Sequence, residues 1–463
     1  MSTYRDILNG IFFQPGPLQI LGRPKTVPSR NRNTMSMFPP DHALRITLAE
    51  EVHARPPEAV QAPARASYVA VLVEPENRTR ELAHLNALCE AQGVAGPAPG
   101  STQFRAELPG VRLKWERHGE FSGYTVIARG LNEQPFQIVA ASLLPAGWLS
   151  ALPGATMAAV HAELLTAPEE SRVRSLLQES FGGQTISGAE IADGAARLFT
   201  DFQLHDGCSR FLLFDRSLTA RQAGRTLQRL FEIEAYRMLA LLALPIARRQ
   251  NPRIVQIESS LASLTDGIAR GQGDDEALLH ELTRLAAEVE SGLAASQFRF
   301  GACRAYFELV TRRIAELRES RLPGVQTIDE FMARRFTPAV DTCSSVSNRL
   351  HDLSERVAQA SSLLSTRVDI TRERQNQALL SSMDRRAKLQ LRLQQTVEGL
   401  SVAAICYYVA GLVGYLSKGL KAGGLAIDTD LVVGITIPVV AIGVILAVRR
   451  TRKRISDKDE HLA

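Results

Sequence analysis

Two short stretches of the sequence gather side chains that could transfer protons or hold a ligand. The first stretch is EEVHARPP, residues 50–57, which carries Glu50, Glu51, His53 and Arg55 ahead of two prolines. Carboxylate, imidazole and guanidinium groups this close together can serve in general acid–base catalysis or in ligand binding. The same cluster can instead cap or clamp the edge of a domain, and the sequence leaves both interpretations open.

The second stretch is WERHGEF, residues 115–121, which places Glu116, His118 and Glu120 around a tight turn. Carboxylate and imidazole donors make this a candidate metal-binding hairpin. The alternative is a solvated hairpin tip whose charges face water. The spacing alone does not separate the two.

Stronger catalytic signatures are absent from the sequence. It contains no phosphate-binding loop, nucleophile elbow, zinc-protease motif or dinucleotide fingerprint. The cysteines lie far apart without a CxxC spacing, so they form neither a zinc set nor a disulfide framework and fit a reducing compartment. We therefore predict no catalytic residue, no metal site and no cofactor, and an enzyme is kept only as an alternative that would use Glu51, His53 and Arg55.

The elements that must position these side chains fall into two classes. Residues 66–215 read as short strands with alternating apolar residues, and Asp206-Gly207 marks a hairpin turn suited to positive φ. We expect an α/β domain over residues 41–215, after a disordered lead-in over residues 1–40 that is rich in Pro, Arg and Asn.

Residues 216–398 are instead predicted to form a helical bundle and a long stalk helix, with Ser217 as a candidate N-cap at its start. A heptad seam runs through its second half. Its positions are Phe336, Cys343, Leu350, Val357 and Leu364, with Ala339, Val346, Leu353 and Ala360 at the three-residue offset. This seam predicts a coiled-coil or bundle helix and self-association through residues 336–364.

Two apolar runs near the C-terminus predict membrane-spanning helices over residues 399–418 and 431–448, joined by an outer loop over residues 419–430. Each run has the length of a short span. The tail, residues 449–463, holds Arg449, Arg450, Arg452, Lys453 and Arg454. The positive-inside rule then places the tail, and with it the N-terminal domain, in the cytoplasm.

The first span has polar and small residues that an apolar anchor does not require, namely Tyr407, Tyr408, Gly411, Gly414 and Tyr415. They predict either a helix-packing face or a surface lining an aqueous pore. Neither apolar run contains a charged residue or a histidine between its flanking charges, which are Glu398 and Lys418 for the first run, and this argues against a charged ion site at mid-membrane. Asp428 and Asp430 flank the second span, where they could attract cations or only mark the interface.

Three segments carry a resemblance: EEVHARPP, WERHGEFSGYTVI and TVEGLSVAAICYYVAGLVGYL, in this order. From about residue 38 onward the chain resembles a bacterial family of uncharacterised membrane-anchored proteins with a domain of unknown function. The resemblance implies a bacterial inner (cytoplasmic) membrane location and no particular chemistry.

The predicted order of elements is also similar to the CorA-type magnesium channels, in which the first span lines a pore and ends in Gly-Met-Asn. Here the corresponding stretch reads VGYLSKGL, so magnesium selectivity is not implied. A divalent cation enters only under this alternative, because a shared fold does not carry function.

Together the patterns predict an α+β cytoplasmic domain, a long-helix bundle and stalk, and two C-terminal transmembrane helices in a CorA-like architecture. The predicted function is a membrane-anchored oligomer that acts as a scaffold or binds a partner, with a CorA-like ion channel as the alternative. The expected partners are the lipid bilayer and further copies of the chain, with a protein partner that the sequence does not identify. The net charge is only +5 and no basic stripe alternates with aromatics, so nucleic acid is not an expected partner.

Overall fold

The computed structural model describes residues 42–45, 48–49, 57–132, 134–271, 273–423 and 428–459. The chain divides into two compact units, Met1–Ser361 and Ser362–Ala463. The predicted lead-in over residues 1–40 and the cluster of Glu50, Glu51, His53 and Arg55 lie outside the described residues.

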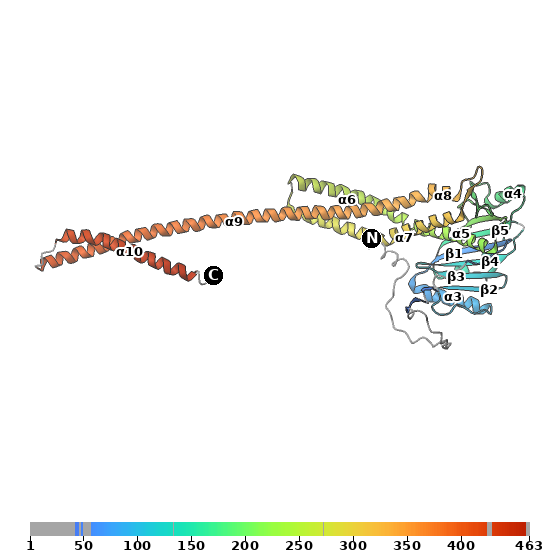
Figure 1. The fold of residues 1–463 in the computed structure, drawn as a ribbon, viewed down its shortest axis with the longest axis horizontal. Coiled ribbons are helices and arrows are strands. Elements are labelled where there is room, and N and C mark those ends of the chain that lie inside the picture. The colour runs from blue at the N-terminus through green and yellow to red at the C-terminus, as the bar shows by residue number, and fades with distance from the viewer. Residues whose placement is uncertain are drawn as a thin grey trace, which may run out of the picture. The chain divides into compact units, whose positions relative to one another are not determined.

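The first unit is built on a ten-stranded sheet with the strand order β10-β6-β7-β9-β5-β1-β4-β3-β2, in which β8 pairs with β9. Figure 1 labels the part of this sheet formed by β5, β1, β4, β3 and β2. Neighbouring strands are antiparallel except for the parallel pair β5 and β9. The strands are β1 (Ala64–Leu72), β2 (Gln103–Leu108), β3 (Val111–Arg117), β4 (Phe121–Arg129), β5 (Ala155–Thr166), β6 (Ser187–Ile191), β7 (Ala196–Thr200), β8 (Leu204–His205), β9 (Cys208–Asp215) and β10 (Ser320–Arg321). The predicted turn is confirmed: Asp206 and Gly207 have φ of 53° and 82° between β8 and β9.

Helices cover both faces of this sheet. On one face, α3 (Arg78–Ala91) packs Leu85 and Leu88 against Trp115 and Tyr124. The same face carries α4 (Glu170–Phe181) over β7 and β9, as the strand registers show. On the other face lies α5 (Ala220–Leu241), whose Phe231 stacks on Tyr68 with ring centroids 5.1 Å apart. The short turns η1 (Pro75–Asn77), η2 (Ala140–Leu143) and η3 (Leu149–Ala151) complete the connections.

The start of α5 differs from the prediction. Thr219, not Ser217, is the N-cap: its hydroxyl accepts from the Gln222 amide while the Gln222 side chain accepts from the Thr219 amide. This reciprocal capping box satisfies two backbone donors at once, which a lone serine two residues earlier cannot do.

A helical bundle completes the first unit. It consists of α6 (Leu244–Arg270), α7 (Asp275–Leu317), the short α8 (Ile328–Arg335) and the N-terminal part of α9 (Thr337–Ala422). Arg349 of α9 pairs with Glu258 of α6 at 2.7 Å, and Ser354 of α9 donates to Glu290 of α7 at 2.8 Å.

The heptad seam is buried inside this bundle. Cys343, Val346, Leu350, Leu353 and Val357 are all 3% exposed or less within a single chain. Leu350 reaches the α7 backbone at Gly292, where an added Cβ would lie 3.4 Å from its Cδ2. The seam is therefore satisfied by the protein's own helices, and self-association through residues 336–364 stays a prediction that these side chains do not require.

The second unit contains the remainder of α9 and α10 (Thr429–Asp459). Each of these helices is long and apolar enough to cross a membrane, and the apolar window of each has no buried residue. The two helices meet where a Cβ on Gly414 would lie 3.4 Å from Cγ2 of Val433. Gly414 thus lets the two helices approach closely.

A buried carboxylate joins α3 to the sheet. Glu81 is fully buried and accepts hydrogen bonds from Trp115 Nε1 at 3.1 Å and from the Tyr124 hydroxyl at 2.8 Å. Arg78 lies 3.5 Å away and supplies the positive charge. Burial, together with the Glu81 charge, raises the pKa of Tyr124, so its hydroxyl stays a donor.

A partly buried histidine on β5 makes the stability of the first unit depend on pH. Nδ1 of His161 lies 2.9 Å from the Ser67 hydroxyl, and burial, aided by the Arg210 charge, lowers the His161 pKa from 6.5 to about 4. Because the folded-state pKa lies below the unfolded one, the stabilisation is complete above pH 6.5 and is lost as pH falls toward about 4.

We expect the wild-type protein to lose about 2–3 kcal/mol of unfolding free energy between about pH 7 and about pH 4.5 through this residue. Urea unfolding of the wild type and of His161→Gln at both pH values measures the difference, since carboxylates elsewhere titrate equally in both proteins. Parallel pH profiles for the two proteins would contradict the assignment.

Candidate functional site

A cavity of about 320 Å³ lies in the first unit between the sheet and helix α5, with α7 at its side. The sheet strands β1, β3 and β4 form its floor, and the segment of Glu58 and Val60 closes one end. Its lining residues are Glu58, Val60, Tyr68, Lys114, Glu116, His118, Phe121, Thr125, Ile127, Gly224, Leu227, Gln228, Phe231, Glu232, Tyr236, Leu309 and Arg313.

Two charged residues of β3 stand on the cavity floor. Side chains alternate along a strand, so Lys114 and Glu116 face the cavity while Leu113 and Trp115 face the opposite core. Lys114 Nζ and Glu116 Oε2 form an ion pair at 2.9 Å, and both residues are buried. The cavity therefore contains a positive and a negative group that water scarcely reaches.

Glycine at position 123 makes room for a tyrosine beside this pair. Gly123 lies opposite Glu116 in the β3–β4 register, and a Cβ there would come within 2.9 Å of the Tyr68 hydroxyl. Burial raises the pKa of Tyr68, and the nearby Tyr236 and Glu116 raise it further. Tyr68 thus remains neutral and offers a hydroxyl, not a base, to the cavity.

The approach of α5 to the cavity's end depends on a second glycine. A Cβ on Gly224 would lie 1.5 Å from the carbonyl oxygen of Glu58, so only glycine fits. Two further contacts fix the segment of Glu58 and Val60. The Val60 amide donates to the Ala220 carbonyl at 2.9 Å, and Arg105 pairs with Glu58 at 2.8 Å.

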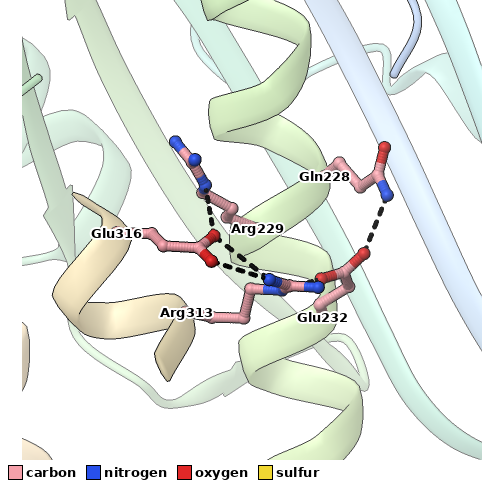
Figure 2. A network of polar contacts seen from close by, with 5 residues as sticks. All are labelled: Gln228, Arg229, Glu232, Arg313 and Glu316. Carbon is pink, nitrogen blue, oxygen red and sulfur yellow. Dashed lines mark hydrogen bonds and ion pairs between the residues drawn. The ribbon is translucent and has the colours of Figure 1, made fainter. Parts of the chain in front are cut away.

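A polar network between α5 and α7 forms the far wall (Figure 2). Arg313 of α7 donates to Glu232 of α5 and also to Glu316 at 3.0 Å. Gln228 donates to Glu232 at 2.8 Å, while its own Oε1 is buried without a hydrogen-bond partner among the described residues. That oxygen is an acceptor available to a bound molecule.

The structure separates the predicted hairpin residues. Glu116 and His118 line the cavity, and the His118 ring stacks on Phe121 with centroids 4.3 Å apart. Glu120 instead accepts from Arg299 at 2.8 Å and from the Tyr306 hydroxyl at 2.7 Å, and so fastens the hairpin to α7. In the part of the chain that the structure describes, no group of three or more His, Cys, Asp or Glu residues could hold a metal ion.

Several cavity residues were not predicted from the sequence, namely Tyr68, Lys114, Gln228, Glu232 and Arg313. A usable signal existed only for Lys114: it alternates with apolar residues in a strand whose other face is buried. The α5 and α7 residues lie over a hundred positions farther along the chain, and nothing local marks them.

The residues that the sequence analysis named in and beside the spans lie in different environments. Gly414 lies at the contact with α10, whereas Tyr407, Tyr408 and Tyr415 are more than 70% exposed in the single chain. Asp428 caps α10, because its Oδ1 accepts from the Asp430 amide at 3.2 Å. The packing and pore roles of this face remain predictions.

Comparison with the curated proteins gives no match. A family model does match the chain, and its description is "Protein of unknown function (DUF3422)". The match covers residues 40–455, which include the whole described sheet, the helical bundle, α9 and α10 as far as residue 455. The chain therefore belongs to the DUF3422 family of proteins of unknown function.

Proposed function

We propose that this protein is a membrane-anchored binding protein whose first unit takes up a small organic ligand in the cavity beside α5. The observation that carries the proposal is the buried Lys114–Glu116 pair on the floor of a cavity of about 320 Å³. Burying such a pair gains little stability over apolar side chains of similar size. Charged groups kept in a buried hollow are, by contrast, typical of binding and catalytic sites.

The lining supports a ligand with an apolar body and a polar end. Ile127, Leu227 and Leu309 provide apolar walls, and the rings of Phe231 and Tyr68 extend them. The Lys114–Glu116 pair and the unpartnered oxygen of Gln228 provide a charged and an accepting end. The volume fits a molecule at the small end of the usual ligand range.

Anchorage rests on the two apolar helices, which we place in the cytoplasmic membrane with both ends of the chain on the cytoplasmic side. The exposed side chains of Leu389, Leu393, Val397 and Leu400, spaced three or four residues apart on α9, support association of copies next to the membrane. In this role the protein presents its binding unit at the inner face of the membrane and can serve as a scaffold there.

Ligand-observed NMR on the detergent-solubilised full-length protein tests the cavity, with a set of aromatic and aliphatic carboxylates and amines as probes. We expect a subset of these probes to bind the wild type and to bind the double variant Lys114→Met/Glu116→Gln at least tenfold more weakly. The double variant removes both charges together, so no charge is left buried without its partner and folding is retained.

Gln228→Met is a second test, because it removes the amide oxygen while keeping the side-chain length. Its matched control is Gln256→Met on the exposed surface of α6, which should bind the probes as the wild type does. Binding that is equal in the wild type, the double variant and Gln228→Met would contradict the proposed cavity.

A further inference from the structure

A second hollow, of about 460 Å³, lies beside Arg229 and Glu316, two members of the network between α5 and α7. Arginines of two helices converge there: Arg225 and Arg229 come from α5, and Arg312 and the cap residue Arg318 come from the end of α7. We call these four residues the arginine pocket. Nothing in the candidate site described above uses it.

The arginine pocket carries an excess of positive charge. Glu316 is its one lining carboxylate among the described residues, and it already accepts from Arg229 at 2.9 Å and from Arg313. Arg318 pairs with Asp193 at 3.0 Å, where both side chains are more than half exposed. Arg225 and Arg312 have no hydrogen-bonded or ionic partner in the part of the chain that the structure describes.

One side of the pocket is held in shape, whereas Arg225, Arg312 and Arg318 are exposed. Arg229 is fixed through Nε by Glu316, which leaves its two terminal nitrogens directed elsewhere. Glu316 is in turn fixed by Arg313, so α5 and α7 cannot separate at this point without breaking the network. Arg229 therefore presents a guanidinium group in a fixed position, and the planar guanidinium fork of an arginine matches phosphoryl oxygens in two-point contacts.

We propose that the arginine pocket binds a small ligand with two phosphoryl groups. One group would lie between Arg225 and Arg312, which have the free donors, and the second would be met by the terminal nitrogens of Arg229. A single carboxylate would neutralise only one of the uncommitted guanidinium groups. This inference concerns a different hollow and does not rest on the function proposed above.

Isothermal titration of the detergent-solubilised full-length protein with inorganic pyrophosphate tests the inference. We expect binding that weakens as salt is raised, and an affinity at least tenfold lower in Arg225→Gln/Arg312→Gln. The matched control, Arg249→Gln/Arg253→Gln, changes two exposed arginines of α6 and should bind as the wild type does.

Two further probes separate the sources of the phosphoryl groups. Tighter binding of ADP than of glycerol 1,3-bisphosphate supports a soluble diphosphate, and the reverse order supports a lipid headgroup that carries two phosphoryl groups. Absence of pyrophosphate binding to the wild type, or equal affinity in the wild type and Arg225→Gln/Arg312→Gln, would overturn the inference.

Discussion

Replacement of Glu81 by alanine is expected to lower the unfolding free energy of the first unit by about 3–5 kcal/mol. The substitution leaves the Trp115 indole N–H and the Tyr124 hydroxyl without their acceptor in a fully buried site. It also removes the negative charge beside Arg78. Each unsatisfied buried donor costs about 1–3 kcal/mol, and the truncated side chain leaves a small void.

Urea unfolding followed by tryptophan fluorescence measures this effect, because both tryptophans, Trp115 and Trp148, lie in the core that α3 covers. Glu81→Gln keeps an acceptor of the same shape and should lose less stability than Glu81→Ala. Glu90→Ala, on the exposed side of the same helix, should remain within about 0.5 kcal/mol of the wild type. If Glu81→Ala proves as stable as Glu90→Ala, the buried carboxylate does not hold α3 to the sheet.

The second large effect concerns the membrane. Leu412 and Ile442 are exposed in the apolar windows of α9 and α10, and we expect Leu412→Arg/Ile442→Arg to release most of the protein from the membrane. An arginine at the centre of a spanning helix disfavours insertion by about 2.5–3.5 kcal/mol, so two of them oppose both spans.

Alkaline carbonate extraction of membranes gives the readout, with the wild type in the pellet and the double variant in the supernatant. Leu389→Arg/Leu391→Arg introduces the same charges at exposed apolar positions of α9 before the span and should stay in the pellet. A wild-type protein that carbonate extracts, or a double variant that pellets as fully as the wild type, would argue against spanning helices.

Local patterns of the sequence were enough to predict a strand-rich domain over residues 66–215 and a helical region after it, but they did not mark β2, β5, β6 or β10. The alternation over β3 and the Asp206-Gly207 turn depend on neighbouring residues only, so they can be read without the fold. The capping box at Thr219 was missed because Ser217 and Thr219 are both good caps, and the choice depends on where Gln222 falls.

The candidate site was only partly predictable, because its halves are far apart in sequence. Glu116 and His118 were noticed for their types, but a hairpin tip facing water has the same pattern as a strand covered by a later helix. The residues of α5 and α7 that cover β3, such as Phe231 and Arg313, come close to Glu116 and His118 only when these helices pack on the sheet.

The heptad seam could also be predicted only in part from the sequence. Apolar residues at a and d positions predict that one face of the helix is buried, but they do not identify the helix that buries it. Here α6 and α7 of the same chain bury Leu350 and Leu353, so the pattern of a multi-chain coil is met within one molecule.

Arg313 couples ligand binding in the cavity to ligand binding in the arginine pocket. It donates to Glu232, which lines the cavity, and to Glu316, which lines the arginine pocket. A phosphoryl ligand on the terminal nitrogens of Arg229 would compete with Glu316 for the positive charge of Arg229, so Glu316 would attract Arg313 more strongly and the contact of Arg313 with Glu232 would weaken. Occupancy of one hollow would then change affinity in the other, and by linkage the factor must be the same in both directions.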